Sequence, residues 1–91
     1  MYQLLRTPGY EQALRNLEGD AGRLEALLEK SVYWFLERNP RLGLPTLTPG
    51  YWVMRRRVIE GLLTIRVLYT FDEAARTVTL LSIQEVMMMN P

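Results

Sequence analysis

The spacing of apolar residues changes near Tyr51, and this change limits the possible folds more than any other feature of the chain. Between residues 8 and 39, apolar side chains recur at every third or fourth position, which is typical of amphipathic helices. From Tyr51 onward, short runs rich in Val, Ile, Thr and aromatic residues are typical of strands. Residues 40–50 hold three prolines and two glycines and are expected to form a loop.

Two helices are expected in the first half. Thr7-Pro8 predicts the start of the first helix, with the Thr7 hydroxyl as N-cap and Pro8 at the first helical position. Asp20 is expected to cap a longer second helix, which Asn39-Pro40 ends. Before them, Tyr2 to Arg6 is an apolar-rich stretch and is expected to be a strand.

The second half predicts a meander of antiparallel strands. The expected strands are Tyr51 to Val58, Leu62 to Phe71 and Thr77 to Ile83, with turns at Glu60-Gly61 and at residues 72–76 and a candidate last strand at Val86 to Met89. The element order is then β-α-α-β-β-β. We expect a single α+β domain over residues 1–91, with a helical hairpin packed on one face of an antiparallel sheet. The other face of the sheet is left for a ligand.

Two residue types are missing from the chain. It has no cysteine, which excludes disulfides and thiolate metal sites, and no histidine, the commonest general base at neutral pH. No apolar run reaches transmembrane length, and the N-terminus lacks the features of a signal peptide. These features predict a cytoplasmic protein that uses no metal or other cofactor and does not bind a membrane.

Positive charge is concentrated in one segment. Residues 1–50 carry six basic and six acidic side chains, whereas residues 51–66 carry four arginines against one glutamate, a net charge of +3. Alternate residues of a strand face opposite ways, so Arg55 and Arg57 should share a face and Arg56 should oppose them. Together with Arg66 on a neighbouring strand, Arg55 and Arg57 predict a basic patch that binds RNA or an acidic protein. A merely solvated sheet edge is the alternative.

The chain resembles the RelE/ParE superfamily, the toxins of type II toxin–antitoxin systems, over nearly its full length. The stretch YQLLRTPGYEQALRNL is similar to the first strand and helix of these toxins. The stretch YWVMRRRVIEGLLTIRVLYTFDEAARTVTLLSI is similar to their sheet. Within it, IRVLY (Ile65 to Tyr69) is similar to the family's strand core, which places an Arg before two apolar residues and an aromatic.

The resemblance implies a toxin held inactive by a cognate antitoxin protein, with one of two activities. RelE-like members are endoribonucleases (mRNA interferases) that cut messenger RNA on the ribosome without metal and so inhibit translation. ParE-like members do no covalent chemistry and instead poison DNA gyrase. A degenerate toxin fold that survives as a binding module is a third alternative.

Three residues are candidates for the catalytic chemistry. Arg66 matches the family's strand arginine, which contacts the scissile phosphate in RNA-cleaving members; the alternatives are that it pairs with an acidic group across the sheet or only covers the open face of the sheet. Glu60 is a candidate base, although an ordinary turn residue is the simpler interpretation. Glu85 is a candidate proton donor in the stretch LLSIQEVMMMNP, which lacks the basic residues and the Tyr or His found there in RNA-cleaving relatives. This departure counts against a fully equipped nuclease.

The last apolar residues are expected to contact a partner. Met87, Met88 and Met89 form an adaptable surface, and a chain of this size with 48% hydrophobic residues gains stability from a partner. We expect the antitoxin to bind there, or a homodimer to form in its absence; packing into the protein's own core is the alternative. The aromatic pairs Tyr33-Trp34 and Tyr51-Trp52 could stack bases, but core or partner contact is favoured.

Overall fold

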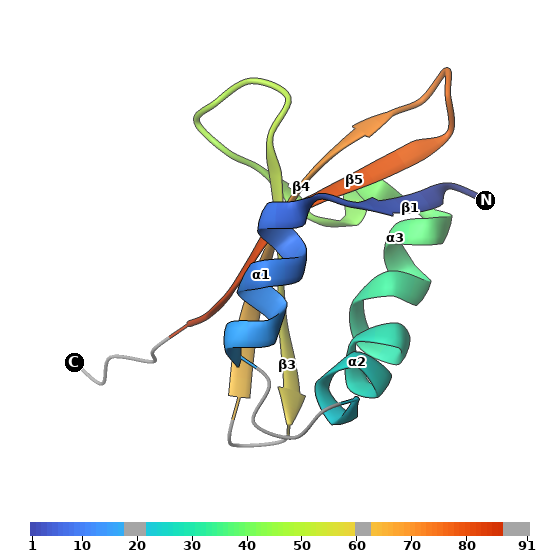
Figure 1. Ribbon diagram of the computed structural model, residues 1–91. Coiled ribbons are helices and arrows are strands. Elements are labelled where there is room, and N and C mark those ends of the chain that lie inside the picture. The colour runs from blue at the N-terminus through green and yellow to red at the C-terminus, as the bar shows by residue number, and fades with distance from the viewer. Residues whose placement is uncertain (18–21, 60–62, 87–91) are drawn as a thin grey trace.

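The computed structural model describes residues 1–17, 22–59 and 63–86 (Figure 1). Five strands form one sheet in the order β1-β5-β4-β3-β2. The strands are β1 (Gln3–Arg6), β2 (Leu44–Pro45), β3 (Trp52–Ile59), β4 (Leu63–Asp72) and β5 (Thr77–Glu85). The helical segments are α1 (Pro8–Leu17), α2 (Arg23–Leu28), the π-helix η1 (Glu29–Tyr33), α3 (Trp34–Arg38) and the 3-10 helix η2 (Pro40–Leu42).

The predicted α+β fold is confirmed, with one correction to the sheet. Strands β2 to β5 pair antiparallel, but β1 runs parallel to β5, so the sheet is mixed. The direction of β1 depends on the strand that it lies beside, and that strand is at the other end of the sequence. In addition, residues expected as loop form the short strand β2, whose Leu44 pairs with Val53.

The predicted helix boundaries follow from side-chain hydrogen bonds. The Thr7 hydroxyl accepts a hydrogen bond from the backbone N–H of Tyr10 at 3.1 Å, which confirms Thr7 as the N-cap of α1. The second helical segment ends after Arg38, where Asn39 turns to an extended conformation and its Oδ1 accepts from the N–H of Arg41. Asp20, the predicted cap of the second helix, lies outside the described residues.

The longer helical segment contains a π turn that the apolar spacing did not predict. Residues 23–38 run continuously through α2, η1 and α3, and the π turn lies at Glu29–Tyr33. It widens the helix locally, so that the adjacent Val32 and Tyr33 are both buried. The Ser31 hydroxyl donates to the carbonyl of Leu27 at 2.8 Å, one turn earlier.

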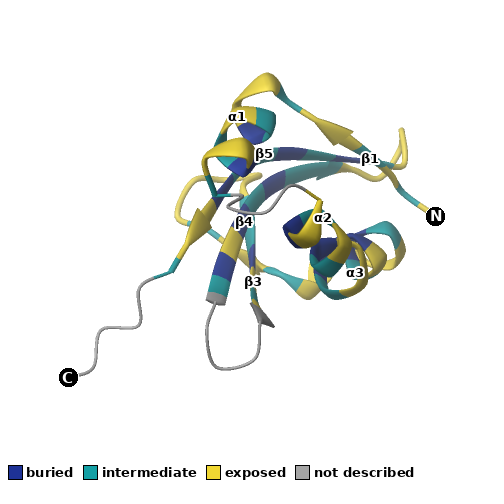
Figure 2. Cartoon of the chain, turned by 60° about the horizontal axis from the view of Figure 1, so that its bottom comes forward, coloured by how far each residue is buried: buried dark blue, intermediate teal, exposed yellow. Residues whose placement is uncertain are grey.

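Both helical segments cover the same face of the sheet. α1 packs along β5, while α2 and η1 contact β3 and α3 contacts β1. The buried residues lie between the helices and the sheet, as Figure 2 shows. They form one cluster, namely Tyr10, Leu14, Leu24, Leu28, Val32, Tyr33, Leu36, Met54, Ile65, Val67, Tyr69, Val78, Leu80 and Ile83.

A β-bulge in β5 decides which of its residues enter the core. Tyr69 pairs with Leu80, but the preceding residue, Leu68, pairs with Ser82, so Leu81 is the extra residue of β5. After this shift, Ile83 faces the helices and is buried. Gln84 therefore faces the other side of the sheet.

The turn between β4 and β5 matches its prediction. The Asp72 carboxylate accepts a hydrogen bond from the N–H of Ala75 at 3.1 Å, and Arg76 adopts a positive φ of 56°.

Within the described residues, no helix combines the length and hydropathy needed to cross a bilayer.

Candidate nucleic-acid interface

The face of the sheet turned away from the helices carries the candidate site. Strand alternation, set by the buried positions Met54, Val67 and Ile83, assigns the intervening residues to this uncovered face. They include Val53, Arg55, Arg57, Thr64, Arg66, Leu68, Thr70, Ser82 and Gln84. The uncovered face is thus a row of arginines among small polar and apolar side chains.

Arg55 and Arg66 lie opposite each other on this face. The two residues are Cα partners in the β3–β4 pairing, and Gln84 is the partner of Arg66 on β5. Nη2 of Arg66 donates to Oε1 of Gln84 at 2.9 Å. A single row across three strands therefore reads Arg55, Arg66 and Gln84, and the amide of Gln84 orients one guanidinium without neutralising it.

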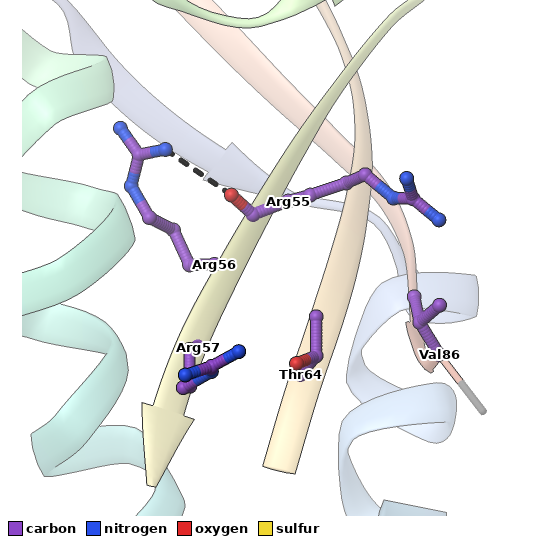
Figure 3. Close-up of a pocket in the computed structure, with 5 residues that line it drawn as sticks. All are labelled: Arg55, Arg56, Arg57, Thr64 and Val86. Atoms are coloured by element: carbon purple, nitrogen blue, oxygen red, sulfur yellow. Dashed lines mark hydrogen bonds between the residues drawn. The ribbon is translucent and has the colours of Figure 1, made fainter. Parts of the chain in front are cut away.

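A groove lies one row further along the same strands (Figure 3). It has a volume of about 430 Å³ and is lined by Arg55, Arg56, Arg57, Thr64 and Val86. The backbone N–H of Val86 donates to the carbonyl of Thr64 at 2.8 Å, which extends the pairing of β4 and β5 into the groove. Figure 3 shows that the side chains of Arg55 and Arg56 leave β3 in opposite directions. The predicted alternation of the three arginines is confirmed.

The charges of the uncovered face are unbalanced. Across residues 1–17, 22–59 and 63–86, neither Arg55, Arg57 nor Arg66 makes an ion pair. The carboxylate of Asp72, at the end of β4, accepts a hydrogen bond from the N–H of Ala75 in the turn and makes no ion pair with these arginines. Guanidinium groups have five N–H donors in a planar fork and stay protonated at any physiological pH, so this face suits phosphate oxygens. Among the described residues there is also no group of three or more carboxylates placed to hold a metal ion.

Comparison with solved structures identifies the architecture. The chain is similar to the RelBE2 toxin–antitoxin complex from Mycobacterium tuberculosis, with a TM-score of 0.73 and 26% identity over 93% of this chain and 98% of that chain. It is similar to the isolated RelE toxin of E. coli, with a TM-score of 0.67 and 16% identity over 98% of this chain and 88% of that one. The chain has a RelE-like toxin fold.

A third structure with the same fold is an E. coli RelE mutant bound to a peptide of the antitoxin RelBc. Its TM-score is 0.63 and its identity is 17%, over 96% of this chain and 85% of that one. Comparison with protein-family models and with curated proteins gives no match. The similarity to the RelE toxins therefore rests on the fold, and the residues of this chain must be assessed individually.

Within this RelE-like fold, the candidate catalytic residues do not all come together. Glu85 pairs with the buried Ile65, so strand alternation places it on the helix side of the sheet, opposite Arg66. The expected grouping of Glu85 with Arg66 in one site is therefore corrected. The bulge at Leu81 is the reason, since it exchanges the faces of all the residues that follow it. Glu60 lies outside the described residues, as do Met87, Met88 and Met89.

Gln84 is the residue of this face that the sequence interpretation missed. The sequence predicts no role for it, whereas in the structure its amide oxygen accepts a hydrogen bond from the guanidinium of Arg66. If β4 and β5 paired regularly from the turn at residues 73–76, Ile83 would lie opposite Arg66. The bulge shifts the register by one residue and places Gln84 there instead. No residue type in LLSIQE predicts this bulge.

Three of the four aromatic candidates lie away from the uncovered face. Tyr33 is buried among the helices, and Trp52 packs on Phe71 with ring centroids 5.3 Å apart. Trp34 is exposed on α3, with the guanidinium of Arg38 stacked 3.8 Å from its ring centroid. Tyr51 is exposed just before β3. Core and helix-surface contacts thus account for three of the four aromatic side chains.

A partly buried polar cluster on the helix side links β1 to both helical segments. Arg6 bonds Glu25 at 2.8 Å, Glu25 accepts from the Tyr33 hydroxyl at 3.1 Å, and that hydroxyl lies 2.7 Å from the hydroxyl of Tyr10. The bond to Glu25 raises the pKa of Arg6, and burial raises the pKa of Tyr10 to about 12. Each polar group has a partner, so the cluster stabilises the helix packing and is not assigned to the site.

Proposed function

We propose that this chain is the toxin of a type II toxin–antitoxin system and that it cleaves messenger RNA on the ribosome. The observation that carries the proposal is the juxtaposition of Arg55 and Arg66 on a sheet face that none of the described helices covers. Arg57 adds a third cation two residues along β3. The positive charge of this face attracts the phosphate backbone of RNA, and little negative charge on the face opposes that attraction.

Arg66 is the proposed phosphate contact of the reaction. The 2′-hydroxyl of one nucleotide attacks the adjacent phosphorus, a 2′-O–P bond forms, and the P–O5′ bond breaks. The 2′-hydroxyl loses a proton and the 5′-oxygen gains one, which leaves a cyclic phosphate and a 5′-hydroxyl. Arg66, oriented by Gln84, and Arg55 stabilise the extra negative charge on the phosphate oxygens as it develops.

The proton transfers need other groups. An arginine stays protonated and is a poor base, and the described residues of the uncovered face include no Tyr, His or Glu. Glu60 remains the proposed base. This shortage specifically favours a second candidate function, a non-catalytic poison of DNA gyrase, in which the same arginines bind an acidic surface or a nucleic acid without cutting it.

A cognate antitoxin is the proposed protein partner. The similar structures from Mycobacterium tuberculosis and E. coli include a toxin–antitoxin complex and a toxin–antitoxin peptide complex. Apolar side chains beside the short edge strand β2 also support a protein partner: Leu42 is 48% exposed, Leu44 66% and Leu47 fully exposed.

Ribosome-dependent cleavage of a defined messenger RNA tests the function. The parent chain is expected to cut the message in the presence of ribosomes, and Arg66→Ala to slow the cut by about 100-fold, as loss of one charge-stabilising donor commonly does. Arg23→Ala is the matched control, because Arg23 is an exposed arginine on α2, far in sequence from the site. It should cleave like the parent.

The opposite results separate the two candidate functions. No cleavage by the parent, together with inhibition of gyrase supercoiling, would replace the nuclease by the gyrase poison. Arg66→Ala that stays folded and cuts as fast as the parent would remove Arg66 from the site. Growth arrest on expression without antitoxin, relieved by Arg66→Ala, is expected under either candidate.

A further inference from the structure

Beyond Val53, the strand β3, which carries Arg55 and Arg57, is paired with a described strand on one side only. β4 pairs with β3 along its length, but β2 reaches no further than Val53. Among the described residues, no strand pairs with the outer edge of β3 beyond that point. The pairing of Leu44 with Val53 turns the backbone groups of alternate β3 residues outward, which includes those of Arg55 and Arg57. The outer backbone edge at these two residues therefore has no strand partner among the described residues, and a different contact must stabilise it.

Arg56 supplies a contact on this outer side. Its Nη1 donates to the outward carbonyl of Arg55 at 3.1 Å, which Figure 3 shows as a dashed line. Its Nε donates to the carbonyl of Ser31 at 3.3 Å, and its guanidinium carbon lies 5.2 Å from the ring centroid of Phe35. One half-buried side chain thus joins the edge of the sheet to the helix layer.

The helix contributes this acceptor from within its π turn. Ser31 lies inside η1, where the backbone hydrogen bonds are spaced differently from those of an α-helix. Its carbonyl accepts from Arg56, while its hydroxyl satisfies the carbonyl of Leu27. Phe35 follows four residues later on the same side of the helix, so the π turn and the next turn together form the surface that the Arg56 guanidinium contacts.

We infer that Arg56 is a positioning residue for the arginines of the uncovered face. Its guanidinium is engaged with Ser31, the Arg55 carbonyl and Phe35 on the helix side of β3, so its role in this inference is to position and not to bind RNA. It holds the outer edge of β3 against the helix, and this fixes the directions in which Arg55 and Arg57 leave the strand. The inference deepens the proposed function and rests on it for the statement that Arg55 and Arg57 bind phosphate.

Two substitutions at one position separate positioning from charge. Arg56→Met keeps the aliphatic contact and removes the donors. Arg56→Lys keeps the charge, but a single ammonium cannot reproduce the planar fork that reaches Ser31 and Arg55 together. Both variants are expected to raise the amide hydrogen exchange of Met54 and Ile65, whose N–H groups point across the β3–β4 pairing, by roughly tenfold, because loss of the Arg56 contacts lets the edge strand β3 open from β4.

The same variants are then titrated with a short single-stranded RNA. Both should bind it several-fold more weakly than the parent, while the amide exchange of Leu80, in the middle of the sheet, stays unchanged. Restoration of RNA binding by Arg56→Lys would show that Arg56 acts as a charge, and the inference would fail. Equal increases in exchange at Leu80 would show general destabilisation, and would also overturn it, as would unchanged exchange at Met54 and Ile65.

The two proposals fail in different ways. A parent chain that neither binds nor cleaves RNA removes the proposed function. The exchange of the Met54 and Ile65 amides, measured on the free protein, still decides whether Arg56 holds the edge of β3.

Discussion

Arg55 and Arg66 are directly opposite partners on β3 and β4, and strand alternation points both away from the helices. Like charges placed opposite each other destabilise a sheet by a few tenths of a kcal/mol up to about 1 kcal/mol. The free protein therefore carries a repulsion that a bound phosphate would relieve. A sheet selected only for stability would place Thr or Val at one of these positions.

The first prediction concerns this repulsion. Arg66→Thr should increase the free energy of unfolding by about 0.5 kcal/mol at low salt, because it removes a like-charge pair and inserts a residue that favours strands. The gain should shrink as salt is added, since exposed charges are screened. Urea unfolding at low and high ionic strength measures both effects. A variant less stable than the parent at low salt would show that the Arg55–Arg66 pair is not repulsive.

The second prediction concerns the number of phosphate contacts. Arg66→Ala and Arg55→Ala should each lower the salt slope of single-stranded RNA binding by about 0.7, which is the contribution of one phosphate contact. The double variant should lose about twice as much. Arg23→Ala is again the control. An unchanged slope in Arg66→Ala, with weaker binding, would mean that its guanidinium contacts no phosphate.

The third prediction concerns Gly43, which lies between η2 and β2. A Cβ at this position would lie 2.5 Å from the carbonyl oxygen of Val53 and 3.1 Å from Cζ of Tyr69. Gly43→Ala should therefore destabilise the protein by about 1–3 kcal/mol through overpacking. Gly9→Ala is the matched control, because its nearest neighbour outside the helix is 3.5 Å away and alanine favours helices. Urea unfolding of both variants tests the contrast, which equal stabilities would contradict.

The fourth prediction concerns alkaline stability. Burial raises the pKa of Tyr10 and of Tyr69 from 10.0 to about 12. Between these values the unfolded chain loses protons that the folded chain keeps, so the free energy of unfolding is intact below pH 10 and falls as the pH rises toward 12. Urea unfolding across this range measures the fall.

Tyr69→Phe tests the cause of this fall. The variant should lose about 1 kcal/mol at neutral pH, since the Tyr69 hydroxyl donates to the carbonyl of Pro40. Above pH 10, however, its stability should fall less steeply than that of the parent. The exposed Tyr51 provides the control substitution, Tyr51→Phe. Parallel curves for the parent and Tyr69→Phe would contradict the assignment to Tyr69.

The fifth prediction concerns Met87, Met88 and Met89, whose proposed partner contact lies outside the described residues. Substitution of all three by Ser should abolish self-association of the purified chain and weaken antitoxin binding, while the fold is kept. Sedimentation of the parent and the substituted chain measures this. A parent that stays monomeric at high concentration, and a substituted chain that unfolds, would show that these methionines pack in the core.

The local elements of this protein could be predicted from the sequence because their causes are local. Apolar spacing predicts α1 and the longer helical segment, and the Thr7 hydroxyl and Asn39-Pro40 set boundaries through contacts a few residues away. Alternation within β3 is a property of any strand, so the opposite directions of Arg55 and Arg56 followed as well.

The tertiary structure decided what depends on residues far apart in the chain. The parallel pairing of β1 arises from its place beside β5, and the bulge at Leu81 puts Gln84, not Ile83, beside Arg66 and sends Glu85 to the helix side. The π turn at Ser31 provides an acceptor that only the packed β3 can use. The strand register, and the side of the sheet that each residue faces, depend on tertiary contacts such as the burial of Ile83 and the contact of Arg56 with the helix. These contacts stabilise only the assembled helix and sheet layers, so no single segment of the sequence determines them.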